Sequence, residues 1–186
     1  MRTATHLAVA CLAVVSLLSV AIAAEDSLTS PYRHQTQSGP RGLSESEIAE
    51  LRAGTGMGLA RAAELNSYPG PRHVLDAIHA GRLQASPTQV RQLQEIFDVM
   101  RSDARRLGAQ ILSEEEQLET AFRTTTIAES DLRARVARIA SLQGELRITH
   151  LRAHLRARTV LTEAQVSRYD EIRGYTTEPP AHQHTH

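Results

Sequence analysis

The chain has 186 residues, and its 21 basic side chains balance its 21 acidic ones at a formal net charge of zero. All of the basic residues are arginines, so the chain has no lysine for Schiff-base or P-loop chemistry. A neutral chain with only six aromatic residues (two Phe, four Tyr, no Trp) is also a poor candidate for binding nucleic acid. The length and the 41% hydrophobic content suit one domain with a modest core.

Residues 1–24 have the pattern of a secretory signal peptide. Arg2 supplies the positive start, residues 7–20 are apolar, and residues 21–23 (Ala-Ile-Ala) offer a cleavage site. The alternatives are a membrane anchor, for which the apolar stretch falls short of the usual ~20 residues, and a lipid attached to Cys11. Cleavage would remove Cys11, the only cysteine. We therefore expect a periplasmic protein without a thiol and without membrane insertion.

The rest of the chain divides by composition into a leader, one domain and a tail. Residues 25–43 are rich in Ser, Thr, Gln, Pro and Gly and predict a flexible leader. Residues 44–175 carry the periodic apolar runs of a folded domain. Residues 176–186 form a proline-broken tail, for which weak metal chelation and plain solvation are alternative interpretations. The tail histidines are His182, His184 and His186.

Helix starts are marked by capping boxes, in which a Ser or Thr is followed three residues later by Glu or Gln. The hydroxyl accepts from the third backbone amide of the helix, and the longer side chain accepts from the amide of the cap residue. Each box opens a run of periodic apolar residues. The four expected caps are Ser44, Ser86, Thr126 and Thr162.

Two long apolar-periodic runs predict a pair of long helices. They cover residues 87 to about 122 and 127 to about 159, and the short connection between them predicts an antiparallel hairpin. The first seam is Val90, Leu93, Phe97, Met100, Ala104, Leu107, Ile111 and Leu118, and the second includes Leu132, Val136, Ile139 and Leu146. Gly108 is expected to weaken the first helix locally.

Shorter elements complete the expected all-α domain. A glycine-broken run follows Ser44, a short helix is expected over residues 72–80, and a last helix over residues 163–173. No segment has the alternating pattern of a strand. Because a thin hairpin cannot cover its own seam, we expect an intertwined homodimer.

An ordered set of motifs resembles a known family. Residues 161–165 read Leu-Thr-Glu-Ala-Gln, which matches an LTxxQ motif, and residues 83–89 look like a degenerate copy of it. The other shared stretches are residues 54–58, 63–66, 68–75 and 150–155, Tyr169 and residues 173–175. Together they resemble the Spy/CpxP-like periplasmic chaperones and the related periplasmic heavy-metal sensors.

The resemblance implies an all-helical, often dimeric periplasmic protein that is not an enzyme. Members of this kind either hold unfolded client proteins or bind metal with helix histidines assisted by carboxylate or methionine. In the sensor pattern the histidine pair lies near the N-terminal helix, whereas here it lies on the second long helix.

His150 and His154 are the strongest candidates for metal ligands. They stand four residues apart on one face of a predicted helix, on the same side as its apolar seam, so both imidazoles can reach one ion. His73, after a Pro-Gly-Pro turn, Glu64 and Met57 are candidate additional ligands. Without a thiolate, such a set suits zinc, with nickel, cobalt or copper as alternatives. The competing interpretation is core packing for the pair and for Met57, a turn cap for His73 and a solvated Glu64.

Enzymatic motifs are missing from the sequence: it has no G-x-S-x-G, no H-E-x-x-H and no P-loop. Two non-enzymatic functions are expected in its place. One is a metal-binding stress or resistance protein that buffers the metal or reports it to a membrane-bound signalling partner. The other is a chaperone that holds unfolded clients on an apolar helical surface rimmed by arginines.

Overall fold

A computed structural model describes residues 29–33 and 40–176. This part of the chain contains helices and irregular segments but no strand, which confirms the all-α prediction for it. The chain divides into two compact units, residues 1–41 and 42–186, and every described helix belongs to the second unit. None of these helices has the length and hydropathy of a membrane span.

Several expectations concern residues outside this range. The predicted signal peptide, most of the predicted leader and the tail with His182, His184 and His186 lie outside the described residues.

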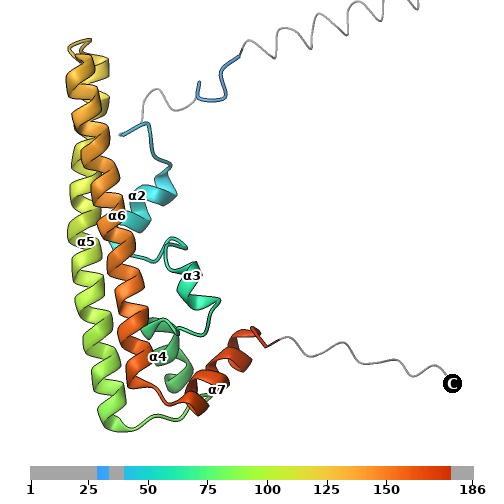
Figure 1. Cartoon of the computed structure of the whole chain (residues 1–186). Coiled ribbons are helices and arrows are strands. Elements are labelled where there is room, and N and C mark those ends of the chain that lie inside the picture. Colours follow the sequence, from blue (N-terminus) through green and yellow to red (C-terminus); the bar gives the residue numbers. More distant parts are fainter. Residues whose placement is uncertain (1–28, 34–39, 177–186) are drawn as a thin grey trace, which may run out of the picture. The chain divides into compact units, whose positions relative to one another are not determined.

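Two long helices form the main body of the second unit. Helix α5 (Pro87–Arg123) and helix α6 (Glu129–Val160) are joined by residues 124–128 and pack side by side along their length (Figure 1). Because the connection is so short, the two helices run in opposite directions.

Four shorter helices lie along one side of this pair in Figure 1. They are α2 (Glu45–Ala53), α3 (Arg61–Glu64), α4 (Pro71–His79) and α7 (Glu163–Arg173). Helices α2 and α4 pack on α5, α3 and α4 contact α6, and α7 contacts α4. The shorter helices therefore form a third layer over part of the long pair.

Capping boxes form at Ser44, Ser86 and Thr162, where each hydroxyl accepts from the third amide of its helix. The expectation for Thr126 is wrong: α6 begins at Glu129, after an extended Ala128 that makes no side-chain cap bond. The Thr126 hydroxyl lies instead 2.9 Å from the hydroxyl of Thr124. The turn between the long helices thus uses this threonine for its own hydrogen bonds, and α6 starts two residues later than predicted.

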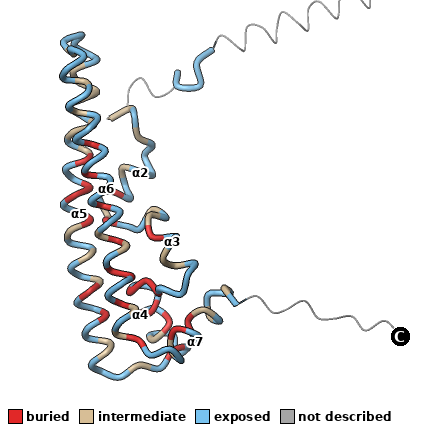
Figure 2. Tube along the Cα trace, viewed as in Figure 1, coloured by how far each residue is buried: buried red, intermediate tan, exposed pale blue. Residues whose placement is uncertain are grey.

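Most of the buried apolar residues form two clusters. Buried residues are the red segments in Figure 2. The base cluster gathers α4, α7 and the adjoining ends of α5 and α6, and it comprises Val74, Leu75, Ala77, Leu83, Leu93, Ala157, Leu161, Val166 and Tyr169. The middle cluster lies under α2 and comprises Leu51, Ala104, Leu107, Ile111, Leu142 and Leu146. The seam prediction is wrong for Val136, which is 49% exposed because no third helix covers it.

Gly108 has a packing role in the middle cluster. A Cβ atom added there would lie 2.2 Å from the carbonyl oxygen of Leu51, so only glycine lets α2 approach α5 this closely. Gly144 on α6 is a contrasting case, since nothing lies within 4 Å of the Cβ position there.

Candidate functional site

A cavity of about 450 Å³ at the base of the long helices is lined by all five residues that the sequence singled out as metal ligands. These are Met57, Glu64, His73, His150 and His154. They come from the loop after α2, from α3, from the first turn of α4 and from α6. The fold thus brings to one cavity side chains that are up to 97 positions apart in the sequence, from Met57 to His154.

His150 and His154 lie on the covered face of α6, where they are 3% and 9% exposed. The Nε2 atom of His150 is buried and has no hydrogen-bond partner among the described residues. Burial, and secondly the neighbouring His154, lower the pKa of His150. Its imidazole is therefore neutral near pH 7 and has a nitrogen lone pair available without the loss of a proton.

The ring of His154 is held in one orientation by the turn before α4. Its Nδ1 atom lies 2.7 Å from the carbonyl oxygen of Tyr68. Because a carbonyl can only accept, Nδ1 carries a proton, and of the two tautomers of a neutral ring this one leaves the lone pair on Nε2. A Cβ atom on Gly70 would lie 2.9 Å from Cε1 of this ring, so the glycine between Pro69 and Pro71 is what lets the turn come so close.

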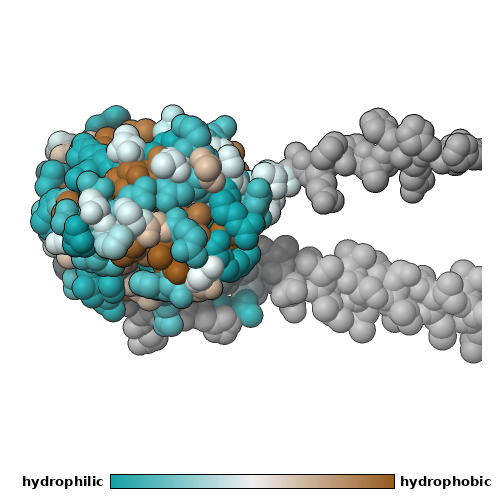
Figure 3. Space-filling model, turned by 90° about the horizontal axis from the view of Figure 1, so that it is seen from below, coloured by the Kyte–Doolittle hydropathy of each residue, from teal (hydrophilic) through white to brown (hydrophobic). Residues whose placement is uncertain are grey.

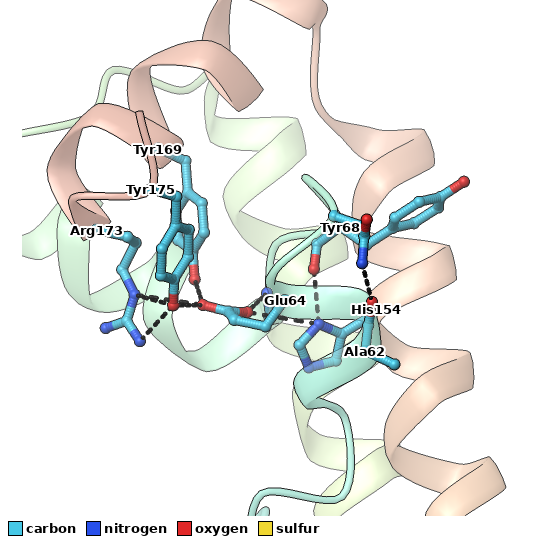
Figure 4. A network of polar contacts seen from close by, with 9 residues as sticks. Ala62, Glu64, Tyr68, His154, Tyr169, Arg173 and Tyr175 are labelled. Carbon is cyan, nitrogen blue, oxygen red and sulfur yellow. Dashed lines mark hydrogen bonds and ion pairs between the residues drawn. The ribbon is translucent and has the colours of Figure 1, made fainter. Parts of the chain in front are cut away.

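Glu64 is the centre of a polar network that links α3 to α7 (Figure 4). Its Oε1 atom accepts from the hydroxyls of Tyr169 at 2.5 Å and Tyr175 at 3.1 Å. The same oxygen lies 3.3 Å from Nε of Arg173. Its Oε2 atom accepts from the amide of Gly70 at 3.2 Å and lies 3.6 Å from Nδ1 of His154. Both oxygens are therefore engaged, and Glu64 positions other groups in this arrangement.

Sequence reasoning missed this network, although one signal for it was present. Tyr169 and the Arg-Gly-Tyr segment at 173–175 occur among the motifs of the resemblance, but no role was inferred for their polar groups. In the structure Tyr169 is fully buried. Burial, and secondly its hydrogen bond to Glu64, raise the pKa of Tyr169. Its hydroxyl therefore stays protonated and donates a hydrogen bond to the Glu64 carboxylate.

The other two candidate ligands are less firmly placed. His73 is exposed on the first turn of α4, and partial burial of its ring together with the charge of Arg173 lowers its pKa. Met57 is half-buried, with a left-handed φ of 47°. Among the described residues, no group of three or more His, Cys, Asp or Glu is arranged to hold a metal ion. The cavity thus gathers candidate ligands without assembling a complete coordination shell.

Comparisons with family models, with curated proteins and with solved structures found no match for this chain. The likeness to periplasmic chaperones and heavy-metal sensors therefore stays a prediction from the motifs.

Proposed function

We propose that this chain is a non-enzymatic periplasmic protein that binds a divalent transition metal through His150 and His154 and buffers or senses that metal. The observation that carries the proposal is the buried Nε2 atom of His150, which has no partner within the described residues and lies one helical turn from a second buried histidine. Buried polar atoms are nearly always hydrogen-bonded, and an exception calls for an explanation such as an ion.

The surroundings of His154 support the same function. Histidines that bind metal usually donate the other ring N–H to a carbonyl or carboxylate, which sets the tautomer and aims the free nitrogen. The Tyr68 carbonyl and the adjacent Glu64 carboxylate provide this arrangement at Nδ1. Imidazole ligands suit zinc, nickel, cobalt or copper, and we favour zinc.

Completing the coordination shell requires more than these two imidazoles. His73 and Met57 line the same cavity and could turn toward the ion, with water in the remaining positions. Glu64 would act as an orienting residue, because its oxygens already accept from two tyrosines and a backbone amide. Such a site would exchange its metal readily, which suits buffering or sensing.

Location and partners are part of the proposal. The periplasmic location rests on the signal-peptide pattern of residues 1–24, and the motif set resembles periplasmic metal sensors and chaperones. The part of the long pair that the shorter helices leave uncovered offers a surface for homodimerisation. A sensor would in addition need a membrane-bound signalling partner, whereas a buffer would not.

Calorimetric titration of the untagged protein with zinc, nickel, cobalt and copper(II) tests the metal site. Wild type should bind one ion per pair of helix histidines, and the double variant His150→Ala/His154→Ala should lose this binding. A deletion of residues 177–186 separates tail chelation from the core site. His79→Ala is a matched control, because His79 is exposed and does not line the cavity. Identical titrations of wild type and double variant, with the fold verified by circular dichroism, would rule out the core site.

A chaperone function is the second candidate, and exposed apolar side chains on the long helices favour it. Val99, Ile148 and Leu155 are 53%, 43% and 55% exposed. Apolar patches interrupted by hydrophilic residues are also visible at the base end of the molecule in Figure 3. Weak, unspecific contacts with unfolded chains suit such a surface.

Suppression of the aggregation of a chemically denatured client is the test of this second function. The metal-free protein should suppress aggregation at a stoichiometric ratio, and Leu155→Glu combined with Val99→Glu should reduce that effect without changing metal binding. Absence of suppression by wild type would exclude the chaperone function and leave the metal function untouched.

A further inference from the structure

A second cavity, of about 380 Å³, adjoins the metal-ligand candidates. It shares His73, His150 and His154 with the first cavity but extends to α5, where Phe97 and Arg101 line it. We call it the arginine cavity, after Arg101 and Arg72. None of the residues that line it is acidic.

The positive charge of this cavity is only partly compensated. The guanidinium carbons of Arg72 and Arg101 lie 5.6 and 6.0 Å from the centre of the Phe97 ring, so both cations flank the same aromatic side chain. Arg72 forms an ion pair with Asp76 at 3.0 Å. Arg101 forms no ion pair with any carboxylate in the described part of the chain. The part of the lining around Phe97 therefore favours an anion.

The first turn of α4 adds hydrogen-bond donors to the same lining. Its N-cap is Gly70, which offers no side-chain cap, and the turn contains no acidic residue. Within the described residues, no acceptor reaches the amides of Arg72 and His73. The Glu64 carboxylate accepts from the Gly70 amide at 3.2 Å, but the next two free amides remain available. Together with the positive end of the helix dipole they attract a further anion.

An independent observation indicates that this cavity takes a ligand. His150 is 3% exposed and also lines the arginine cavity, and its Nε2 atom has no partner among the described residues. A ligand in this cavity could supply the hydrogen-bonding group that the ring lacks. The cavity is larger than a simple oxyanion requires, and Phe97, Met100 and Pro71 give it apolar walls.

We propose that the arginine cavity binds a small organic carboxylate. Its carboxylate group would accept from Arg101 and the first amides of α4, and also from a proton on Nε2 of His150. Its apolar body would lie against Phe97 and Met100. This inference does not require a bound metal, although both proposals use Nε2 of His150 and the two cavities share three histidines.

Calorimetric titration with benzoate tests the proposal on untagged protein that has been stripped of metal on a chelating resin. Benzamide, which has the same shape without the charge, and inorganic sulfate serve as comparison ligands. Benzoate should bind saturably at one site, and benzamide and sulfate should each bind at least about tenfold more weakly.

Matched arginine variants locate the site. Arg101→Gln should weaken benzoate binding about tenfold. Arg91→Gln removes the same charge from an exposed position of the same helix outside the cavity and should bind benzoate like wild type. Absence of saturable benzoate binding, or equal binding by the two variants, would overturn the proposal. Sulfate binding as tight as that of benzoate would overturn the organic part of it. Since no metal is present, failure of benzoate to bind would leave the metal function untouched.

Discussion

The two ends of the long helix pair differ in what covers them. At the base, α4 and α7 pack against the pair, and the buried base cluster and the Glu64 network both lie there. At the far end, every residue from 112 to 138 is described and none is buried. The helices are linked there by polar contacts, such as the 3.0 Å hydrogen bond from Arg135 to Gln117 and a 3.8 Å ion pair from Arg135 to Glu114.

This difference shows that a heptad-like pattern does not by itself bury side chains. Leu118 and Leu132 continue the apolar seam into the far end, yet each is only half-buried, because two helices alone enclose a narrow strip. Burial becomes complete only where a third helix lies over the pair. Both candidate cavities, and His150 with its Nε2 unpartnered among the described residues, accordingly lie where the shorter helices and their loops cover the pair.

The largest expected effect separates the two ends directly. Leu93→Ala removes a fully buried side chain of the base cluster and should lower the free energy of unfolding by about 2–5 kcal/mol. Leu118→Ala at the far end should cost about 1 kcal/mol or less. Urea denaturation measures both. If Leu118→Ala instead lowers the free energy of unfolding by several kcal/mol, and the loss depends on protein concentration, a second copy of the chain buries the far end.

The next effect concerns the two helix glycines. Gly108→Ala forces α2 away from α5 and should destabilise the protein by about 1–3 kcal/mol. Gly144→Ala, in open space on α6, should stabilise it by about 0.5–1 kcal/mol, because alanine reduces the conformational freedom of the unfolded chain. Thermal unfolding of the two variants gives the comparison. If both variants shift the unfolding temperature in the same direction, the close approach of Leu51 to Gly108 is contradicted.

These positions also show what the sequence could and could not predict. Helix starts at Ser44, Ser86 and Thr162 depend on residues three positions apart, so the sequence predicts them well. The prediction that a helix starts at Thr126 is wrong, because the hydroxyl of Thr124 competes for the Thr126 hydroxyl. Gly108 was expected only to weaken its helix, since its contact with α2 is not local.

The candidate site likewise has one part that local sequence predicts and one part that depends on contacts between distant residues. The spacing of His150 and His154 is local and places both on one helix face, as observed. The hydrogen bonds of Glu64 connect it to residues more than a hundred positions away, and no local pattern predicts them. A carboxylate that seemed from its sequence to be either a ligand or solvated is instead the link between α3 and α7.

A moderate effect is expected when this link is weakened. Glu64→Gln keeps the shape of the side chain but removes the charge beside Arg173, and it should cost about 1.5 kcal/mol of unfolding free energy. Tyr169→Phe, which removes one donor to the same carboxylate, should cost about 1 kcal/mol. Glu171→Gln breaks an exposed ion pair with Arg168 in α7 and should cost well below 1 kcal/mol. A Glu64→Gln variant as stable as Glu171→Gln would contradict the network.

The smallest expected effect is a pH dependence that has opposite signs at the two ends. At the base, burial lowers the pKa of His150 below its ordinary 6.5, so near and below pH 6.5 the unfolded chain binds more protons than the folded one. Stability of the metal-free protein should therefore fall as the pH drops below about 6.5, and His150→Gln should flatten that fall. His73, whose pKa burial also lowers, contributes in the same direction.

At the far end partial burial raises the pKa of Glu115 above its ordinary 4.5, so the folded chain binds the extra proton there. That carboxyl favours the folded state at acid pH, and its contribution is lost as the pH rises through the raised pKa. Urea midpoints measured across this range for wild type, His150→Gln and Glu115→Gln separate the two ends. If His150→Gln loses stability on acidification as steeply as wild type, the buried imidazole is not what makes the base sensitive to acid. Added zinc sharpens the same measurement, because a metal held by His150 competes with the proton and should make the wild-type profile steeper than that of the variant.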